Sequence, residues 1–464
     1  MLSFNYRTKQ CILLVGDIVT FFTGLWVAVL IRQFQIPDIT YIKSLLPLFG
    51  VVFFCWIVIN YISSLYDIEQ VTYTKQYYKR FTETAVISFV VGIIFFYLSP
   101  NKDIAPKTIL LLTAAIGYSG SAIWRRSYKN IFRAKRLTTN VMFVGYNNEI
   151  KELITLLQHQ PEKGFKINTI IDPEKSIDKE EMKDIEIYHG LHTIRPAITS
   201  HHINLVVIAP HLRKNVEALR ELYELLFWSV EITDLTSFYE QITGRIPPST
   251  FSEGWFLDHI KNTTHPVYNR IRTILDYGAG FLLGLIFIIL LPFIAIAIKA
   301  SSKGAIFFTQ TRVGKNGRQF KLYKFRSMYT LAPDGSAEID GVQFAKKEDV
   351  RITWIGKILR KVRLDELPQA LNLLKRDVTL IGPRPERPEI VQQLEERMPY
   401  YPLRHVMRPG ITGWAVINQN YTDTLESSLE KLQYDLYYIK NKSLLMDMSI
   451  LLRTVNVIAR FMGQ

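Results

Sequence analysis

The sequence predicts a membrane-bound protein in three parts: an N-terminal bundle of four membrane-spanning α-helices, a middle α/β layer, and a mainly helical C-terminal domain. Hydrophobic residues make up 48% of the 464 residues, yet 21% are charged, which favours membrane segments joined to a water-facing part. Apolar stretches fill the first quarter of the chain, and short apolar runs alternate with helical patterns after residue 140. We place the three parts at residues 1–136, 137–250 and 251–464.

The four predicted spans are the apolar stretches at residues 11–31, 44–61, 85–98 and 108–124. A membrane-spanning helix needs about 20 apolar residues, so the third stretch is short. Basic residues cluster before the first stretch, between the second and third, and after the fourth. Cytoplasmic loops carry such an excess of basic residues, so both ends of the bundle are predicted to face the cytoplasm. These residues are Arg7, Lys9, Lys75, Lys79, Arg80, Arg125, Arg126, Lys129, Arg133, Lys135 and Arg136.

One acid, Asp17, lies inside a predicted span. A carboxylate within the membrane is a functional candidate by default. Asp17 is near the cytoplasmic end, where its side chain can reach the interface, so we favour a structural role and keep the functional one as the alternative. The two cysteines, Cys11 and Cys55, lie in apolar runs, which argues against a disulfide framework or a thiolate metal site.

The middle part predicts a parallel α/β layer. Its expected strands are residues 141–144, 167–171 and 205–209, with helices at 149–158 and 216–227. A dinucleotide site would need three glycines, as Gly-x-Gly-x-x-Gly, after the first strand. The chain offers Gly145 alone, and Glu149 would repel a pyrophosphate. We therefore expect a degenerate regulatory or dimerising domain.

A fifth apolar stretch, residues 277–298, has basic residues on both sides: Arg270 and Arg272 before it, Lys299 and Lys303 after it. Basic flanks favour keeping both ends on the cytoplasmic face. Pro292 removes a backbone donor and disfavours helix at the residue before it. We predict a re-entrant helix–break–helix hairpin at about 269–299, with a kinked true span as the alternative.

A β-hairpin is predicted where residues 306–311 and 319–324 flank Asn316-Gly317. This hairpin would bring Arg312, Lys321 and Lys324 into one region suited to an anion. The net charge of +14 also favours phosphorylated substrates and anionic lipid headgroups. Nucleic-acid binding is disfavoured, because the basic residues lack an interleaved aromatic stacking pattern.

Two adjacent acids, Asp365 and Glu366, follow a helical pattern. Neighbouring acids on a helix do not face the same way, so one could attack a substrate while the other holds a metal or orients the first acid. Arg360 lies about one and a half turns earlier. The run Gly-Pro-Arg-Pro at 382–385 stiffens a turn that holds Arg384 outward, which suits phosphate recognition. The run that begins at Arg408, Arg-Pro-Gly-Ile-Thr-Gly, repeats this logic.

Five motifs in order give a specific resemblance: Lys-Phe-Arg-Ser-Met at 324–328, Leu-Asp-Glu-Leu-Pro-Gln at 364–369, the Gly-Pro-Arg-Pro run, Arg-Pro-Gly-Ile-Thr-Gly-Trp at 408–414, and Tyr-Asp-Leu-Tyr-Tyr at 434–438 leading to Ser443 and Asp447. From about 268 to 462 the chain resembles the bacterial sugar transferase family, the monotopic phosphoglycosyl transferases. The four spans and the middle domain, which looks Rossmann-like, resemble the long members, polyprenyl-phosphate hexose-1-phosphate transferases such as undecaprenyl-phosphate glucose phosphotransferase.

The resemblance implies a monotopic transferase domain in which Asp365 attacks the β-phosphate of a UDP-sugar, expels UMP and forms a covalent phosphosugar intermediate. Undecaprenyl phosphate would then accept the hexose 1-phosphate, as the first membrane step of exopolysaccharide, capsule or O-antigen synthesis. Mg²⁺ would lie near Asp365 and Glu366. The implied phosphate-binding residues are Arg384, Arg360, Lys324, Arg326, Arg351 and Arg408, with Asp447 and Asp435 in support.

The resemblance further implies a multi-pass protein of the bacterial inner membrane, in contact with membrane lipids, with its catalytic domain on the cytoplasmic face and a possible homodimer. Here Leu291-Pro292 replaces the usual Ser-Pro at the hairpin break.

Two other function classes remain as alternatives. A membrane-anchored nucleotide-sugar dehydratase or epimerase would need the intact glycine run and a Tyr-x-x-x-Lys motif, and a non-catalytic scaffold of polysaccharide assembly predicts loss of Asp365 or Glu366. The sequence leaves the hexose open, with glucose and galactose ahead of the N-acetylhexosamines.

Overall fold

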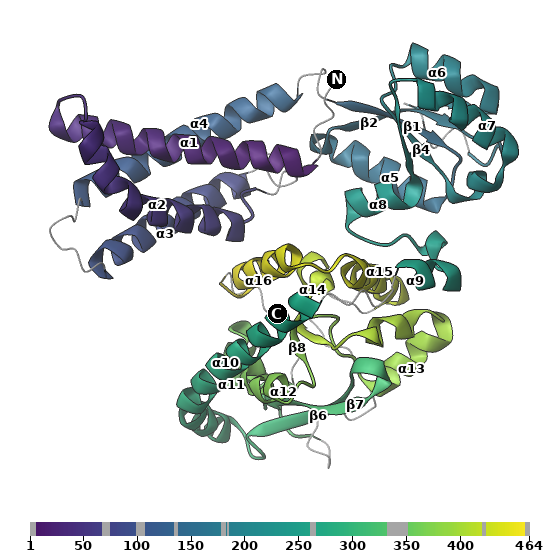
Figure 1. Cartoon of the computed structure of the whole chain (residues 1–464). Helices are drawn as coiled ribbons and strands as arrows, with labels where there is room; N and C mark the ends of the chain where they lie inside the picture. The colour runs from purple at the N-terminus through teal and green to yellow at the C-terminus, as the bar shows by residue number, and fades with distance from the viewer. Residues whose placement is uncertain are drawn as a thin grey trace. The chain divides into compact units, whose positions relative to one another are not determined.

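The computed structural model describes residues 6–66, 75–98, 107–133, 138–177, 182, 185–259, 266–331, 351–419 and 424–459. The chain forms two compact units, Met1–Phe238 and Tyr239–Gln464. The first unit holds the helical bundle and the α/β layer, and the second holds the C-terminal domain (Figure 1).

The bundle consists of α1 (Tyr6–Gln33), α2 (Ile39–Ile62), α3 (Lys75–Leu98) and α4 (Lys107–Arg133). Helices therefore form at all four predicted spans. Gly24 of α1 lies so close to α4 that a Cβ atom there would be 2.9 Å from the backbone nitrogen of Gly117. Small residues allow such close approach of helix backbones in a membrane. Buried aromatic side chains, among them Phe21, Phe53 and Trp56, fill the space among the helices.

Within the described residues, four helices are long and apolar enough to cross a membrane: Gln10–Gln33, Ile39–Ile62, Tyr77–Leu98 and Pro266–Ser301. The fourth predicted span is not among them, although α4 forms. Its apolar run is short, is diluted by Ser119 and Ser121, and ends at Arg125. The composition of α4 thus suits a helix that packs against other helices better than one surrounded by lipid.

Asp17 has a partner that the sequence did not indicate. Its carboxylate forms a buried ion pair with Arg125 of α4 and accepts a 2.7 Å hydrogen bond from the Ser121 hydroxyl. Arg125 was counted as a loop residue in the charge pattern, but its side chain is 1% exposed. Its Nε donates to the Tyr77 hydroxyl at 3.0 Å. One oxygen of the Asp17 carboxylate is therefore paired inside the bundle, while the other is buried without a hydrogen-bond partner among the described residues. The pairing with Arg125 accords with a structural role.

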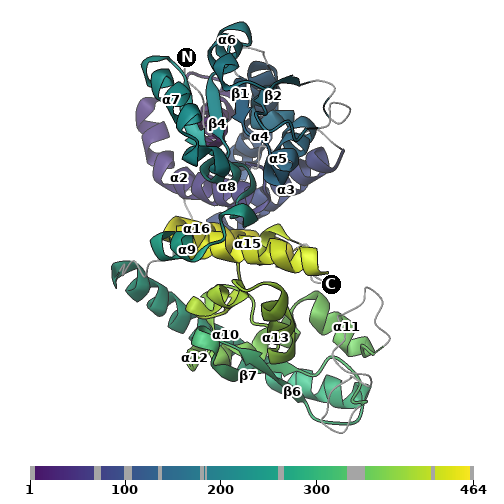
Figure 2. The ribbon, with the colours of Figure 1, turned by 90° about the vertical axis from the view of Figure 1, so that its right-hand side faces the viewer.

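The α/β layer contains β1 (Thr139–Val144), β2 (Phe165–Ile171), β3 (Glu186–Tyr188), β4 (Leu205–Ile208) and β5 (Glu231–Asp234). All pairs are parallel, in the order β3-β2-β1-β4-β5, the order of the first five strands of doubly wound dinucleotide folds. In both whole-chain views α5 (Asn148–His159) lies on the side of the sheet away from α6 (Ile194–Ser200) and α7 (Val216–Glu224) (Figures 1 and 2).

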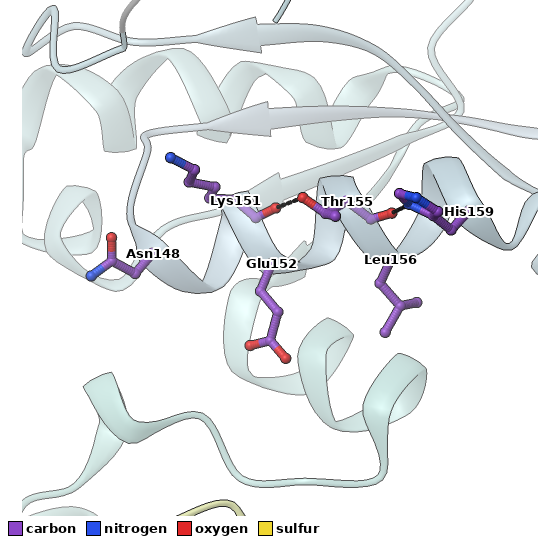
Figure 3. A pocket seen from close by; sticks show the side chains of 6 residues that line it. All are labelled: Asn148, Lys151, Glu152, Thr155, Leu156 and His159. Carbon is purple, nitrogen blue, oxygen red and sulfur yellow. Dashed lines mark hydrogen bonds between the residues drawn. The ribbon is translucent and has the colours of Figure 1, made fainter. Parts of the chain in front are cut away.

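The turn after β1 does not form an open phosphate cradle. Gly145 has a φ of 95°, and a Cβ atom there would be 2.6 Å from that of Ala209. The side chain of Asn147 already caps α5 by accepting from the Ile150 nitrogen at 3.0 Å. A depression on α5 is lined by residues of this one helix, and the dashed bonds of Thr155 and His159 run to the helix backbone (Figure 3). A regulatory or dimerising role of this domain stays a prediction.

The C-terminal unit packs its helices and a hairpin around several apolar clusters. In Figures 1 and 2, α15 and α16 cover one side, and the β6–β7 hairpin lies on the other. The elements are α8 (Leu235–Thr243), α9 (Glu253–His259), α10 (Pro266–Ser301), β6 (Phe307–Val313), β7 (Gln319–Phe325), α11 (Trp354–Lys361), η10 (Leu364–Gln369), α12 (Ala370–Leu374), β8 (Thr379–Ile381), α13 (Pro388–Arg397), η11 (Tyr401–Val406), β9 (Gly410–Thr412), α14 (Trp414–Asn418), α15 (Leu425–Asn441) and α16 (Leu444–Ala459).

The predicted break at Pro292 is absent, because α10 continues as one helix through this residue. One lost backbone hydrogen bond is tolerated where neighbouring packing holds both sides of a proline. Here Phe287 before it and Ile298 after it pack in one cluster with Phe325. Whether α10 enters and leaves by the same membrane face stays a prediction.

Candidate active site

The β6–β7 hairpin forms as predicted. Because successive side chains of a strand point to opposite faces, the register decides which basic residues lie together. Its turn contains Asn316 and Gly317, both at positive φ (56° and 76°). Arg312 pairs with Phe320 in the antiparallel register, so Arg312 and Lys324 share one face. Lys321 lies an odd number of residues from Lys324 and therefore points to the other face. The prediction that Lys321 joins the anion site is wrong for this reason.

The two acids lie in η10, a short 3₁₀ helix between α11 and α12. Arg363 precedes them at a left-handed φ of 57° and separates η10 from α11. Leu367 packs with Phe325 in the core and fixes the position of η10. Asp365 and Glu366 are thereby held beside β7, and the surroundings of the two carboxylates differ.

Glu366 is surrounded by cations. Its Oε1 lies 3.2 Å from Lys324 Nζ and 3.5 Å from Arg384 Nη2, and its Oε2 lies 3.8 Å from Arg363 Nη1. Burial opposes the charge of Glu366, but Lys324, Arg384 and Arg363 outweigh it and lower its pKa to about 2. Glu366 therefore stays ionised and draws three basic side chains from three segments to one place.

Asp365, unlike Glu366, is not paired with these cations. It is 8% exposed, and within the described residues its carboxylate makes no hydrogen bond or ion pair. Burial, together with the charge of Glu366, raises its pKa, against the effect of Lys324 and Arg360. A buried carboxylate beside cations but bonded to none of them is available to react or to bind a ligand.

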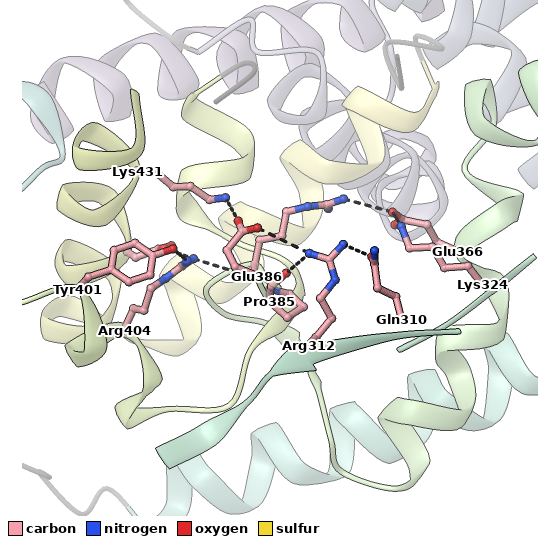
Figure 4. A network of polar contacts seen from close by, with 11 residues as sticks. Gln310, Arg312, Lys324, Glu366, Pro385, Glu386, Tyr401, Arg404 and Lys431 are labelled. Carbon is pink, nitrogen blue, oxygen red and sulfur yellow. Dashed lines mark hydrogen bonds and ion pairs between the residues drawn. The ribbon is translucent and has the colours of Figure 1, made fainter. Parts of the chain in front are cut away.

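Arg404, Lys431 and Arg312 belong to a buried polar network around Pro385 and Glu386 (Figure 4). The carbonyl of Arg384 accepts a 2.9 Å hydrogen bond from Arg404 Nη2, and the same nitrogen donates to Asp435 at 2.7 Å. Glu386, two residues on, pairs with Lys431 of α15 and lies 3.6 Å from Arg312. The Gly-Pro-Arg-Pro turn is thus tied to α15, η11 and β6, so Arg384 is positioned before a substrate arrives.

The two glycine-containing motifs lie side by side. The Gly382 nitrogen donates to the Thr412 carbonyl at 2.8 Å, and the Gly410 nitrogen donates to the Pro383 carbonyl at 2.9 Å. A Cβ atom at Gly410 would be 2.0 Å from the Gly382 nitrogen. Only glycine permits this approach of the two backbones.

The structure brings together Asp365, Glu366, Lys324, Arg384 and Arg360, and it links Asp435 to this group through Arg404. Other predicted residues lie elsewhere. Arg326 is buried and donates to the carbonyls of Ser302 and Lys303, both at 2.8 Å, so it caps the C-terminal end of α10, and a role in phosphate binding stays a prediction.

The neighbours described for three further predicted residues lie outside this group. Asp447 accepts from the hydroxyls of Tyr268 and Tyr438, at 2.9 and 2.7 Å, and so supports the start of α10. Arg408 has Arg376 and Arg272 among its charged neighbours. The carbonyl of Arg351 accepts from the Tyr329 nitrogen at 2.9 Å, and a role in phosphate binding stays a prediction.

Sequence reasoning missed Arg363, Arg404, Glu386 and Lys431. Strand alternation places Arg312 on the same face of the hairpin as Lys324. Glu386 lies beside Arg312 on that face, but no local pattern marks Glu386 as its partner. The remaining contacts join residues far apart in the chain, and each residue alone resembles an ordinary surface charge.

The donor set at Asp365 fits a hard divalent cation. Mg²⁺ prefers oxygen ligands and commonly takes one or two protein carboxylates, with substrate phosphates and water completing its shell. No group of three or more His, Cys, Asp or Glu residues suited to a metal occurs in the described part of the chain. Asp365 has oxygens to offer, whereas Glu366 is already engaged by three cations, so Asp365 is the better candidate ligand.

The role of Asp435 gives a test of positioning. Replacing Asp435 by Asn is expected to lower kcat/KM about 10- to 100-fold, since small displacements of positioning groups cost rates of this order. The loss should lie mainly in KM for a phosphorylated substrate, because Arg384 loses its preset position. Steady-state kinetics over substrate concentration would measure it, with Asp258→Asn, at an exposed acid of α9, as the matched control. A fall in kcat alone would speak against positioning through Arg384.

Comparison with known proteins places this arrangement in a class. Residues 267–461 match the family described as bacterial sugar transferase. A UDP-N-acetylgalactosamine-undecaprenyl-phosphate N-acetylgalactosaminephosphotransferase from Aeromonas hydrophila is 38% identical over 234 residues, 50% of this chain and 53% of that protein. A UDP-glucose:undecaprenyl-phosphate glucose-1-phosphate transferase from Klebsiella pneumoniae is 32% identical over 386 residues, 80% of this chain and 79% of that protein. An exopolysaccharide production protein from Rhizobium leguminosarum bv. phaseoli is 43% identical over 170 residues, 36% of this chain and 83% of that protein.

The fold and the site fit a membrane-associated enzyme that acts on a phosphorylated substrate. The likeness to the Klebsiella protein runs along most of both chains, while this chain covers about half of the Aeromonas protein. The chain belongs to the bacterial sugar transferase family.

Proposed function

We propose that the chain transfers a hexose 1-phosphate from a UDP-sugar to undecaprenyl phosphate, releases UMP, and so begins the assembly of a surface polysaccharide. The observation that carries the proposal is a buried Asp365 that bonds to none of the described residues, next to a Glu366 that gathers Lys324, Arg384 and Arg363. The printed names of relatives, which specify UDP-sugar donors and undecaprenyl phosphate, support the choice of substrates.

In the first proposed step, a carboxylate oxygen of Asp365 attacks the β-phosphorus of the UDP-sugar. The bond from this phosphorus to the bridging oxygen breaks, and UMP leaves with the electron pair. Lys324, Arg384 and Arg363 then offset the negative charge that develops on the phosphate oxygens. In the second step, a phosphate oxygen of undecaprenyl phosphate attacks the same phosphorus, which frees Asp365 and gives the lipid-linked diphosphosugar.

Mg²⁺, when bound near Asp365, would neutralise the diphosphate and lower the repulsion between it and the attacking carboxylate. The protein side of the site supplies the nucleophile, the cations and their positions. Glu366 keeps Lys324 and Arg384 on the substrate side of Asp365.

Contacts along α10 support the proposal that the catalytic unit stays on one face of the membrane. In its first half, Asp276 accepts from the Thr379 hydroxyl at 2.8 Å. In its second half, Phe287 packs on Phe325, and the Ile298 carbonyl accepts from Arg326. A true span would separate the two halves across about 30 Å of hydrocarbon. The charged flanks of the spans favour the cytoplasmic face of the inner membrane.

The proposal is tested with membranes that contain the protein, undecaprenyl phosphate and Mg²⁺, each incubated with one of a panel of UDP-sugars. We expect UMP release with at least one donor, together with a lipid product that carries the sugar and both phosphates. Release of UDP would mean transfer of the sugar without its phosphate and would overturn the proposal. The panel also identifies the hexose.

A further inference from the structure

An amide side chain, Gln310, lies between two basic residues on one face of the β6–β7 hairpin. Alternate residues of a strand share a face, so Gln310 shares its face with Arg312 of β6. On β7, Leu322 is opposite Gln310, and Lys324 is two residues further along. Gln310 therefore occupies the position between Lys324 and Arg312 (Figure 4). Leu322 is apolar and buried, so Gln310 supplies the polar group at this position.

Arg312 fixes the orientation of the Gln310 amide. Arg312 Nη1 donates to the Pro385 carbonyl at 3.1 Å and lies 3.6 Å from Glu386 Oε2, and Arg312 Nη2 donates to Gln310 Oε1 at 2.5 Å. A guanidinium has donors only, so the amide oxygen of Gln310 must face Arg312. The amide nitrogen, with two N–H donors, is left on the other side. In the part of the chain that the structure describes, this nitrogen makes no hydrogen bond.

The charged groups beside this amide belong to the cation cluster of Glu366. Glu366 Oε1 lies 3.2 Å from Lys324 Nζ and 3.5 Å from Arg384 Nη2. Arg384 and Glu366 are also charged neighbours of Arg312. Successive positions on one face of a strand are roughly 7 Å apart, so Gln310 lies about the length of a hexose ring from the position of Lys324. The amide thus adjoins the cations without belonging to them.

We propose that the amide nitrogen of Gln310 donates a hydrogen bond to a hydroxyl of the hexose in the UDP-sugar and so helps to select the sugar. The inference rests on the proposed function, because that function places the phosphate that bears the sugar at Lys324 and Arg384. A neutral amide adds no charge where cations already meet the phosphates, but its hydrogen bond has a direction. A directed donor discriminates between sugars, because a ligand without the matching hydroxyl leaves it unpaired.

The test measures the Kd of UDP-glucose and UDP-galactose, and of analogues that each lack one hexose hydroxyl, for the purified full-length protein in detergent with Mg²⁺. The Asp365→Asn variant is the parent for every measurement, so that the UDP-sugar is bound but not consumed. Adding Gln310→Ala is expected to weaken binding of the preferred UDP-sugar about three- to tenfold, the effect of one neutral hydrogen bond. Gln319→Ala, at an exposed glutamine of the same hairpin, is the matched control and should bind like the parent.

The analogues identify the group that Gln310 contacts. One of them should bind the parent about as weakly as the complete UDP-sugar binds the Gln310→Ala protein, and Gln310→Ala should weaken that analogue no further. UDP, which has no hexose, should bind both proteins alike. If Gln310→Ala weakens UDP and every analogue equally, Gln310 acts through Arg312 or on a phosphate, and the inference is wrong. A loss that vanishes only with an analogue containing deoxyribose would assign Gln310 to the nucleoside instead.

Failure of this inference can be told from failure of the proposed function, because UMP release by the wild type is measured separately. If UMP is released but Gln310→Ala binds every UDP-sugar like the parent, the sugar contact is refuted and the reaction stands. If no UMP is released although one analogue shows the expected pattern, the reaction is refuted and the sugar contact stands. Should Asp365→Asn fail to bind any UDP-sugar, kcat/KM for UMP release by Gln310→Ala in the wild-type chain gives the same comparison.

Discussion

Replacing Asp365 by Asn is expected to lower the rate of UMP release by about three orders of magnitude or more, as loss of a covalent nucleophile does in other enzymes. The amide keeps the shape of the side chain but is a poor nucleophile, and Asp365 has no bonded partner in the described residues whose loss would disturb the fold. Single-turnover UMP release from a UDP-sugar measures the effect. Radiolabelled phosphosugar should remain attached to the wild-type protein and be missing from the variant.

Replacing Glu366 by Gln distinguishes the roles of the two acids. Loss of the Glu366 charge should slow the reaction by misplacing Lys324, Arg384 and Arg363, yet labelled phosphosugar should still attach to Asp365. Asp258→Asn again controls for an exposed acid. Full UMP release by Asp365→Asn would remove Asp365 as the nucleophile, and labelling that disappears only in Glu366→Gln would give that role to Glu366.

The central part of the site could be predicted from the sequence because its motifs are short and local. Asp365 and Glu366 are adjacent in the Leu-Asp-Glu-Leu-Pro-Gln run, Arg384 lies between two prolines, and Arg384 pairs with Glu366 in the structure. Lys324 follows from the hairpin signal of Asn316 and Gly317.

The support behind Arg384 could not be predicted, because it depends on tertiary contacts. Arg404, Lys431 and Glu386 come from η11, α15 and the loop before α13, and no local pattern marks them as buried. A motif residue can also be misassigned. Arg326 lies within a motif, but its guanidinium donates to carbonyls at the end of α10. A single sequence shows that a basic residue belongs to a motif. It does not show which anion or carbonyl that residue contacts in the fold.

The same limit applies to the fold. Apolar periodicity predicted the helices of the bundle and the parallel layer, since both patterns are local. The charge rule counted Arg125 as a loop residue, and only its pairing with Asp17 across α1 and α4 shows that it lies inside the bundle. Pro292 predicted a break, but packing on both sides of it keeps α10 continuous.

Replacing Arg125 by Leu is expected to destabilise the bundle by about 3–5 kcal/mol, because it leaves the Asp17 carboxylate buried without its cation. Asp17 is fully buried, and the Ser121 hydroxyl alone would remain to it as a bonded partner among those described above. Arg125 also lies over the Phe81 ring, 5.4 Å from its centroid, so packing is lost as well. Thermal unfolding in detergent, followed by size-exclusion chromatography, would measure the change.

The Asp17→Leu/Arg125→Leu double variant is the decisive control. Apolar replacement of a whole buried ion pair is often neutral or stabilising, so the double variant should recover most of the stability that Arg125→Leu loses. Arg126→Leu, at the exposed neighbouring position, should change little. If the double variant is as unstable as the single one, the loss comes from contacts of Arg125 with Tyr77 and Phe81, not from the unpaired acid. If Asp17 instead had a catalytic or transport task, the double variant would regain its fold but not its activity, so UMP release by the full-length double variant distinguishes the two roles left open for this acid.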